Sequence, residues 1–280
     1  MTPVIKLSAG GGRGFWEIPV VFEDANVLVI DKPSGLLVSP DRYDKDRPNL
    51  MRMLLDGVAQ SKPFAVERKL DYIANAHRID FDTSGLLVLA KDKPTLVKLA
   101  EQFGNASPKK TYLALVSGTP TEDQFECDLK LRHDVRNPAL MRWARDGKKS
   151  LTRFEVVDRF GGVSLIECRP VTGRTHQIRV HLKASGFPIL ADPLYGDGAT
   201  LLLSQLKRRY RAKDDEEERS LTPRLALHAW KIELVHPVTG EPLKVEAPLP
   251  RDLEVALKLL RKHRPSSIAP SGGRRIPTAG

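Results

Sequence analysis

The sequence predicts an α+β fold, a mixed and largely antiparallel central sheet flanked by helices and loops. Short apolar runs typical of buried strands outnumber the helical patterns, and the two kinds of segment do not alternate regularly. Regular alternation would instead favour a doubly wound parallel sheet. The turn sequence His236-Pro237-Val238-Thr239-Gly240 lies between two apolar runs and predicts a hairpin, which joins antiparallel neighbours.

Each expected strand is a short apolar run, most of them bounded by turn residues such as Lys32-Pro33-Ser34-Gly35. Segment 178–182 is expected to be a strand that bends or becomes helical at its end. The expected strands cover residues 27–30, 86–90, 111–116, 154–157, 165–168, 178–182, 226–235 and 243–247.

Apolar residues at spacings of three and four predict three helices with one buried face. The second of them starts near Pro94, because proline is tolerated in the first turn. The residues on these faces are Leu50, Met53 and Leu54, then Leu96, Leu99, Ala100 and Phe103, and finally Leu253, Ala256, Leu257 and Leu260.

The remaining segments define the expected organisation. Residues 1–19 are Gly-rich and are expected to be flexible, and order is expected to begin at Val20. Residues 20–263 are expected to form one folded domain. Residues 264–280, rich in Pro, Ser, Gly and Arg, are expected to be a disordered basic tail. The charge run 207–219 reads as a solvated insertion.

The chain carries a formal charge of +10 and has a pI near 9.6. A basic surface attracts polyanions, although a basic protein without nucleic-acid partners fits the charge equally well. No apolar run approaches the roughly 20 residues of a membrane span, and no secretory signal opens the chain. Cys127 and Cys168 are expected to be buried free thiols of a cytoplasmic protein. Neither GxGxxG nor a Walker A motif is present, so no nucleotide cofactor is expected.

The segment 76–85, AHRIDFDTSG, is polar and leads directly into the apolar run that begins at Leu86. A polar loop at the mouth of a buried strand suits an active site, because the strand holds the loop in place. Asp80 or Asp82 could equally cap a turn, and the local pattern leaves both interpretations open.

The segment 172–181, TGRTHQIRVH, concentrates donors suited to phosphate or carboxylate groups. If it is a strand, Arg179 and His181 lie on a different face from His176. Zinc is a rival ligand, but His176 and His181 are five positions apart, which fits neither a helical nor a same-face strand pairing. A third segment, Lys109-Lys110-Thr111-Tyr112, supports no functional claim alone.

Taken in order, these segments resemble the RluA-type pseudouridine synthases. The family signature His-Arg-Leu-Asp, followed by Thr-Ser-Gly and an apolar strand, stands here as residues 77–87, with Ile79 in place of leucine. The resemblance covers residues 20–250. The other matching motifs are VIDKPSGL at 29–36, KTY at 110–112, GRTHQIRVH at 173–181, DPLYG at 192–196, and LHA at 227–229 with His236-Pro237.

The resemblance implies the pseudouridine synthase fold over residues 20–263 and an isomerase that flips uridines out of RNA. Asp80 matches the catalytic nucleophile, Tyr112 the tyrosine beside the target base, and Arg179 the arginine that pairs with the aspartate and keeps it ionised. Arg78 matches a position that enters the RNA stack. The expected substrate-binding residues are His77, Arg78, Leu86, Arg174, His176 and Gln177.

The expected partner is ribosomal or transfer RNA, bound by a cytoplasmic monomer without metal or cofactor. The small RNA-binding domain of some relatives is not expected in the short segment before residue 20, and docking is expected to rest on the catalytic domain and the basic tail.

Two rivals stay open. A catalytically silent RNA-binding protein is disfavoured because Asp80, Tyr112 and Arg179 are all present. A glycosidase or nucleosidase could use Asp80 with Asp82, at the roughly 5–9 Å separations such enzymes use. The density of arginine favours a phosphate-bearing substrate over a sugar.

Overall fold

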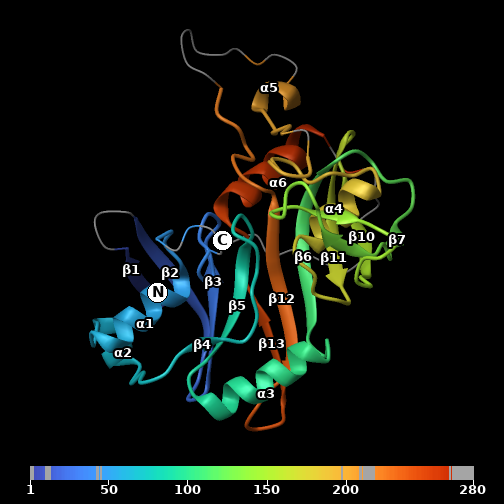
Figure 1. The fold of residues 1–280 in the computed structure, drawn as a ribbon. Helices are drawn as coiled ribbons and strands as arrows, with labels where there is room; N and C mark the ends of the chain where they lie inside the picture. The colour runs from blue at the N-terminus through green and yellow to red at the C-terminus, as the bar shows by residue number, and fades with distance from the viewer. Residues whose placement is uncertain are drawn as a thin grey trace. The chain divides into compact units, whose positions relative to one another are not determined.

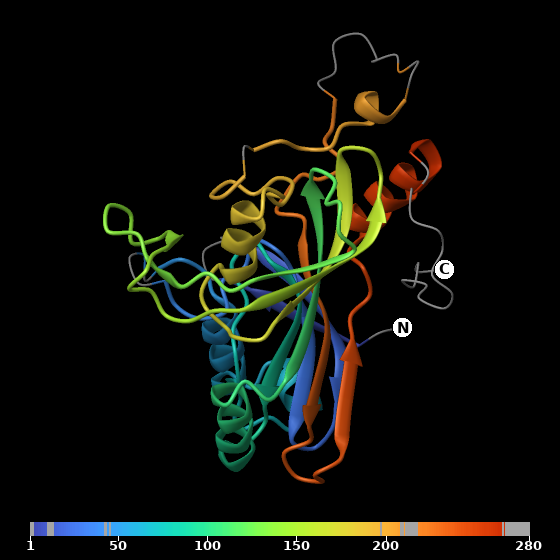
Figure 2. The ribbon, with the colours of Figure 1, turned by 90° about the vertical axis from the view of Figure 1, so that its right-hand side faces the viewer.

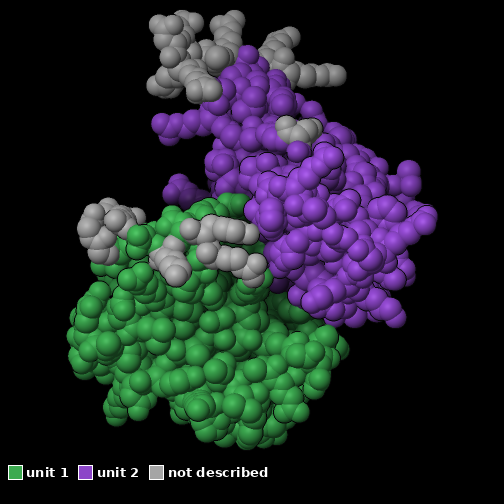
Figure 3. All heavy atoms as spheres, viewed as in Figure 1, with its two compact units in different colours: residues 1–110, 229–247 green, residues 111–228, 248–280 purple. Residues whose placement is uncertain are grey.

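The structure, a computed structural model, describes residues 3–9, 14–41, 44, 46–196, 198–207, 210, 218–264 and 266 (Figure 1). The chain forms two compact units. Unit 1 comprises residues 1–110 and 229–247, and unit 2 comprises residues 111–228 and 248–280 (Figure 3). In the part of the chain that is described, no helix has both the length and the apolar character to cross a membrane.

Unit 1 is built on a sheet with the strand order β1-β2-β3-β5-β12, in which β4 also pairs with β5 and β13 with β12. The pairings of β1 with β2, β2 with β3, β3 with β5, β4 with β5 and β12 with β13 are antiparallel. The elements are β1 (Val4–Ser8), β2 (Phe15–Glu23), β3 (Val27–Lys32), α1 (Leu50–Ala59), α2 (Pro63–Glu67), β4 (Ala74–Asn75), β5 (Ser84–Ala90), α3 (Lys93–Gly104), β12 (Leu227–Val235, from Ala229 onward in this unit) and β13 (Pro242–Glu246).

The core of unit 1 lies between the sheet and helix α3. Val88 of β5 is fully buried, and Leu99 of α3 packs into the same apolar cluster as Ile232 of β12. Asp92 caps α3 by accepting a hydrogen bond from Thr95 N at 2.7 Å. Strand β5 is buried along its whole length and therefore gives the loop that precedes it a rigid base.

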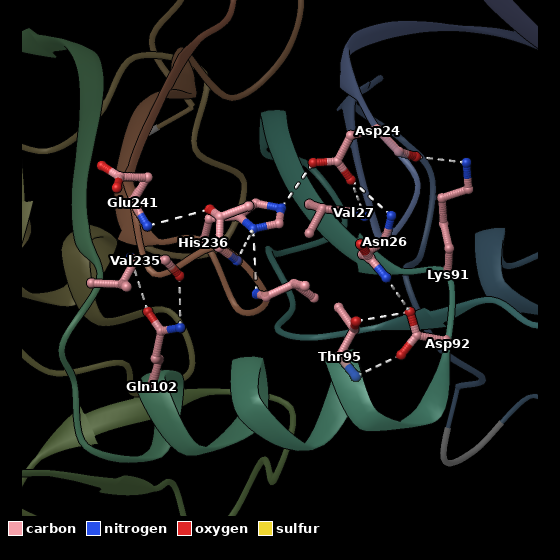
Figure 4. Close-up of polar contacts among 12 residues, drawn as sticks. Asp24, Asn26, Val27, Lys91, Asp92, Thr95, Gln102, Val235, His236 and Glu241 are labelled. Carbon is pink, nitrogen blue, oxygen red and sulfur yellow. Dashed lines mark hydrogen bonds and ion pairs between the residues drawn. The ribbon is translucent and has the colours of Figure 1, made fainter.

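A polar network ties the β12–β13 turn to the β2–β3 turn (Figure 4). His236 Nδ1 accepts hydrogen bonds from Val238 N and Thr239 N, so His236 Nε2 carries the proton and donates to Asp24 Oδ2 at 2.8 Å. Asp24 Oδ1 also accepts from Val27 N at 2.7 Å. Burial opposes ionisation of Asp24, but these bonds and the nearby imidazole lower the net pKa of its carboxyl group. The His236-Pro237 motif therefore stabilises the fold.

Unit 2 contains a second antiparallel sheet segment with the order β6-β11-β10-β7, and a separate hairpin of β8 and β9. Helix α4 packs against β9, β10 and β11, and α5 against α6. The elements are β6 (Lys109–Ser117, from Thr111 onward in this unit), β7 (Gln124–Cys127), β8 (Leu131–His133), β9 (Met141–Trp143), β10 (Thr152–Arg159), β11 (Val163–Pro170), α4 (Gln177–Ala184), α5 (Leu203–Leu206) and α6 (Arg251–His263).

The α+β class and the antiparallel pairing expected from the sequence are confirmed, as are the three expected helices and all of the expected strands except 178–182. Both cysteines are buried and free, as expected. Burial raises the pKa of each thiol, Cys168 well above its ordinary value.

Two expectations are wrong. The segment expected to be flexible up to residue 19 contains β1 and most of β2, which pair in register from Val4↔Pro19 to Ser8↔Phe15. Buried Ile5 and Leu7 alternate with exposed residues, as in a strand with one buried face. The prediction missed this alternation because it gave more weight to the glycines that follow. The expected strand 178–182 lies in helix α4. Every residue of Gln177–Leu182 is buried, so no single apolar face indicated a helix.

Two further expectations fall mostly on residues that the structure does not describe. These are the basic tail, of which only Arg264 and Ser266 are described, and the charge run 207–219, of which residues 208, 209 and 211–217 lie outside the described ranges.

Gly85 provides a direct test of the packing of unit 1. Its φ is +115°, and a Cβ atom there would lie 2.3 Å from Ala229 O and 2.6 Å from Ala229 N. Because this obstacle is backbone, we expect Gly85→Ala to lower the free energy of unfolding by about 2 kcal/mol or more in urea denaturation.

The matched control is Gly104→Ala at the end of α3, where nothing lies within 4 Å of an added Cβ atom. It should leave the free energy of unfolding unchanged or raise it by about 0.5–1 kcal/mol. Equal effects of the two substitutions would contradict the close approach of β5 and β12.

Candidate active site

The loop that carries Asp80 connects β4 to β5 in unit 1. Ile79 is only 7% exposed and anchors the loop in the core, while Asp80 is half-buried and Arg78 is exposed. The main-chain carbonyl of Asp80 accepts a hydrogen bond from Thr83 N at 3.2 Å and closes a turn. A main-chain carbonyl accepts this hydrogen bond, so the turn forms without the Asp80 carboxylate as its acceptor. The capping role that the sequence pattern allowed for this carboxylate is not needed for this bond.

A second loop, residues 32–36, holds the Asp80 loop from the side. Phe81 O accepts hydrogen bonds from Gly35 N at 2.9 Å and from Lys32 Nζ at 3.3 Å. Ser34 Oγ donates to Asp82 O at 2.6 Å. These three bonds fix the backbone on the C-terminal side of Asp80, so the main chain that carries this carboxylate is held in place before any substrate binds.

Lys32 is the centre of this arrangement because its ammonium group is completely buried. Besides Phe81 O, it donates to Pro33 O at 2.7 Å and to Leu36 O at 2.8 Å. Three carbonyl oxygens match the three donors of an ammonium group, which offsets part of the cost of burying the charge. The sequence had marked Lys32 only as part of a motif.

His77 performs a structural task that its substrate-binding prediction did not include. Its Nε2 accepts a hydrogen bond from Val88 N at 3.1 Å, and its ring stacks on Phe103 with the centroids 4.4 Å apart. Burial and the nearby Lys110 cation lower the pKa of His77 from 6.5 to about 3. A neutral imidazole that accepts from strand β5 stabilises the base of the Asp80 loop.

In unit 2, Arg179 on helix α4 forms a buried ion pair with Asp192. Arg179 Nε donates to Asp192 Oδ2 at 2.8 Å and Nη2 to Oδ1 at 2.6 Å, and both side chains are 1% exposed. Asp192 Oδ1 also accepts from Leu194 N and Tyr195 N. Burial opposes ionisation, but Arg179 and these two amides lower the net pKa of Asp192. The guanidinium is therefore fixed in orientation by a bidentate contact.

Tyr195 connects this ion pair to its surroundings. Its ring lies 5.1 Å from Arg179 Cζ, and its hydroxyl lies 2.8 Å from His176 Nδ1. The same hydroxyl oxygen accepts a hydrogen bond from Met141 N at 2.8 Å. His176 and Arg179 both contact Tyr195 because residues three positions apart lie on the same side of a helix. In a strand the two side chains would lie on opposite faces.

Gln177 is buried and uses its whole amide group internally. Its Oε1 accepts from Thr172 Oγ1 and Arg174 N, and its Nε2 donates to Leu151 O and Thr152 Oγ1. An amide group offers two acceptor positions and two donors, so these four bonds use its hydrogen-bonding capacity within the protein. The substrate contact expected of Gln177 stays a prediction, and within the protein the residue positions the exposed Arg174.

Two other predicted site residues lie on strands. Leu86 is 2% exposed within the core cluster of unit 1, so the substrate contact predicted for it finds no support in its position. Tyr112 of β6 is half-buried and pairs with Cys168 of β11.

The structure thus brings Arg179, His176 and Tyr195 together in unit 2, and places Arg78 and Asp80 on one loop of unit 1. The meeting of Asp80 with Tyr112 and Arg179 stays a prediction. Sequence reasoning gave no role to Asp192 and Tyr195, although it had quoted both in the segment DPLYG.

Comparison with known proteins gives a consistent result. The model of the RNA pseudouridylate synthase family matches residues 26–184. The chain is 36% identical over 247 residues to ribosomal large subunit pseudouridine synthase C of Escherichia coli strain K12, covering 88% of this chain and 70% of that protein. It is 35% identical over 258 residues to ribosomal large subunit pseudouridine synthase D of Nitrosomonas europaea, covering 90% and 68%.

Among solved structures, human RNA pseudouridylate synthase domain containing 4 matches with a TM-score of 0.64 and 25% identity, over 86% of this chain and 92% of that chain. Human RNA pseudouridylate synthase domain containing 1 matches with a TM-score of 0.58 and 23% identity, which supports the fold.

The depressed pKa of His77 predicts a pH dependence of stability. Below pH 6.5 the unfolded chain protonates this histidine, while the folded chain does not until about pH 3, so stability falls as the pH drops through that range. His77→Gln keeps an acceptor for Val88 N but does not titrate. We expect its Tm to fall less than that of the wild type between about pH 7 and pH 5 in thermal denaturation. Identical slopes would disprove that His77 stays neutral in the folded chain.

The ion pair of Asp192 predicts a large loss of stability when its charge is removed. Asp192→Asn leaves the Arg179 cation buried without a carboxylate, and we expect the free energy of unfolding to fall by about 3–5 kcal/mol. Glu17→Gln is the control, because Glu17 pairs with Lys6 at 3.3 Å on the exposed surface. This substitution should change the free energy of unfolding by less than about 0.5 kcal/mol. Chemical denaturation measures both, and a loss at Asp192 no larger than at Glu17 would contradict the account.

Proposed function

The chain belongs to the RNA pseudouridylate synthase family, and from this premise we propose that it converts uridines of ribosomal RNA to pseudouridine with Asp80 as its nucleophile. It is an RNA pseudouridine synthase, an isomerase. The proposal of ribosomal RNA rests on the relatives, which are named as ribosomal large subunit enzymes. Transfer RNA as a second substrate stays a prediction, as do the monomeric state and the cytoplasmic location.

The reaction explains why a fixed carboxylate is needed. The bond between ribose C1′ and uracil N1 breaks, the base turns, and a new bond forms between C1′ and C5. The C5 proton is released and N1 gains one, so the step requires neither an oxidant nor water. A carboxylate can form a transient covalent bond or stabilise the charge that develops when the first bond breaks.

The observation that best supports Asp80 is the way its loop is held. Lys32, Ser34 and Gly35 fix the backbone at Phe81 and Asp82, while the Asp80 side chain stays half-buried at the surface of unit 1. A catalytic group needs this combination, because a loose carboxylate would lose the correct distance to the sugar.

Arg179 is proposed to pair with Asp80 through an edge of its guanidinium that Asp192 does not use. Asp192 takes two of the five N–H groups, at Nε and Nη2. The second carboxylate would then meet a cation whose orientation is already set. Tyr112 would lie against the target base, and Arg78 would enter the stack from which the uridine has flipped. Arg174 and His176 would bind RNA close to Arg179.

We expect Asp80→Asn to abolish pseudouridine formation while leaving RNA affinity and Tm close to those of the wild type, because only the charge of one half-buried carboxylate changes. Tritium release from RNA that carries tritium at uridine C5 measures the reaction. Full release by the variant would overturn the assignment.

Asp82→Asn is the matched control, because its backbone carbonyl, not its carboxylate, holds Ser34. It should keep most of the activity. The same assay separates the rival nucleosidase, which would release free uracil, from the isomerase, which releases tritium without free base.

A further inference from the structure

The strongest feature outside this site is a basic segment in unit 2. We call residues 130–149 the basic arm; they comprise hairpin β8–β9 and the strand connections on either side. The arm contains seven Lys and Arg residues and two Asp residues, so its net charge of +5 is half that of the whole chain in 20 of 280 residues. Such a concentration of charge is typical of a surface that contacts a polyanion.

The cations of the arm point to solvent. Arg136, Arg145, Lys148 and Lys149 are exposed, and none of them has an ion pair among the described residues. Arg132 and Arg142 face each other across the hairpin on the side away from α4 and pair with Asp146 and Asp134 respectively. The arm therefore keeps most of its charge uncompensated.

An exposed aromatic side chain lies among these cations. Trp143, the last residue of β9, is 51% exposed, although it shares its face of the hairpin with the buried Leu131 and Met141. The exposed part of this ring is an aromatic surface that a binding partner can cover. Bases of unpaired nucleic acid stack on such rings, and neighbouring cations bind the adjacent phosphates.

The arm has a defined conformation. Asp134 Oδ1 accepts hydrogen bonds from Arg136 N and Asn137 N and so orders the loop between the strands. Leu131 and Met141 pack on Val180 of α4 and on Tyr195, whose hydroxyl accepts from Met141 N. In Figure 2 the hairpin, in lime green, has its tip clear of the other ribbons of unit 2. The arm is thus rigidly mounted on the helix that carries Arg179.

We propose that the basic arm docks an unpaired stretch of the substrate RNA beyond the target uridine, with Trp143 stacking on a base and the cations binding phosphates. The inference rests on the proposed function, because it assumes an RNA substrate. Arg174 extends the same surface, since its Nε donates to Lys149 O at 3.2 Å. Unpaired RNA is favoured over duplex, because a stacking tryptophan needs a base that is free of its own stack.

The test compares binding and catalysis in the full chain. A fluorescein-labelled single-stranded oligoribonucleotide containing uridine is titrated by fluorescence anisotropy, and tritium release is measured on ribosomal RNA. We expect Trp143→Ala to raise Kd about tenfold and Trp143→Phe to raise it less than about threefold, because phenylalanine still stacks. Val135→Ala is the control, since Val135 is 68% exposed on the same arm but offers no ring, and it should leave Kd unchanged.

Two further readouts separate stacking from a structural effect. RNA should quench the tryptophan emission of the wild type, and most of this quenching should disappear in Trp143→Phe, although Trp16 and Trp230 remain. The double variant Lys148→Gln, Lys149→Gln should flatten the dependence of log Kd on log salt by about 0.7 for each phosphate that the protein no longer neutralises. The Tm of each variant should stay at the wild-type value.

The outcomes are distinct. If the wild type releases tritium but Trp143→Ala binds RNA as the wild type does, the arm proposal fails and the proposed function stands. If the wild type binds RNA through Trp143 but releases no tritium, the proposed function fails and the docking site stands. Equal affinity for duplex of the same sequence, or displacement of the RNA by polyglutamate at equal charge concentration, would also overturn the proposal.

Discussion

The bidentate ion pair between Arg179 and Asp192 fixes the part of unit 2 that carries the predicted catalytic arginine. Two charges are removed from water, and their burial is tolerable only because the carboxylate also accepts two amide hydrogen bonds and the guanidinium lies over a tyrosine ring. This arrangement leaves Arg179 one orientation. Tyr195 connects the ion pair to two further segments, because its hydroxyl contacts both His176 and the main chain of the β8–β9 hairpin.

Unit 1 also contains a buried cation, but here the cation is a lysine. Lys32 is fully buried and is compensated by main-chain carbonyls, one of which belongs to the residue after Asp80. A lysine ammonium is compact and can be enclosed in this way, whereas an arginine suits the planar contact with a carboxylate. In each unit a buried cation therefore holds a loop or helix that carries a predicted catalytic residue. Such groups contribute more to geometry than to net stability.

Much of this could be predicted from the sequence. The strand 84–90, the helix 93–104 and the β12–β13 hairpin carry local periodicity or turn signals that their packing reinforces. Helix α4 was predicted as a strand because it is buried on all sides, and the partner of Arg179 was not predicted because Asp192 follows 13 residues later, after a loop. The structural roles of His77 and Gln177 were also not predicted, because their hydrogen-bond partners lie far away in the sequence. A segment rich in hydrogen-bond donors predicts a binding or catalytic site. Only the structure shows that these two side chains form hydrogen bonds within the protein.

The main proposal is that Arg179, already held by Asp192, also pairs with Asp80. A crystal structure of the whole chain tests it most directly, through the distance between the Asp80 carboxylate and the Arg179 guanidinium. We expect a separation within about 4 Å, with the Asp192 contact to Nε and Nη2 retained. An Asp80 carboxylate that faces solvent, or an Arg179 that must release Asp192 to reach it, would rule out this pairing.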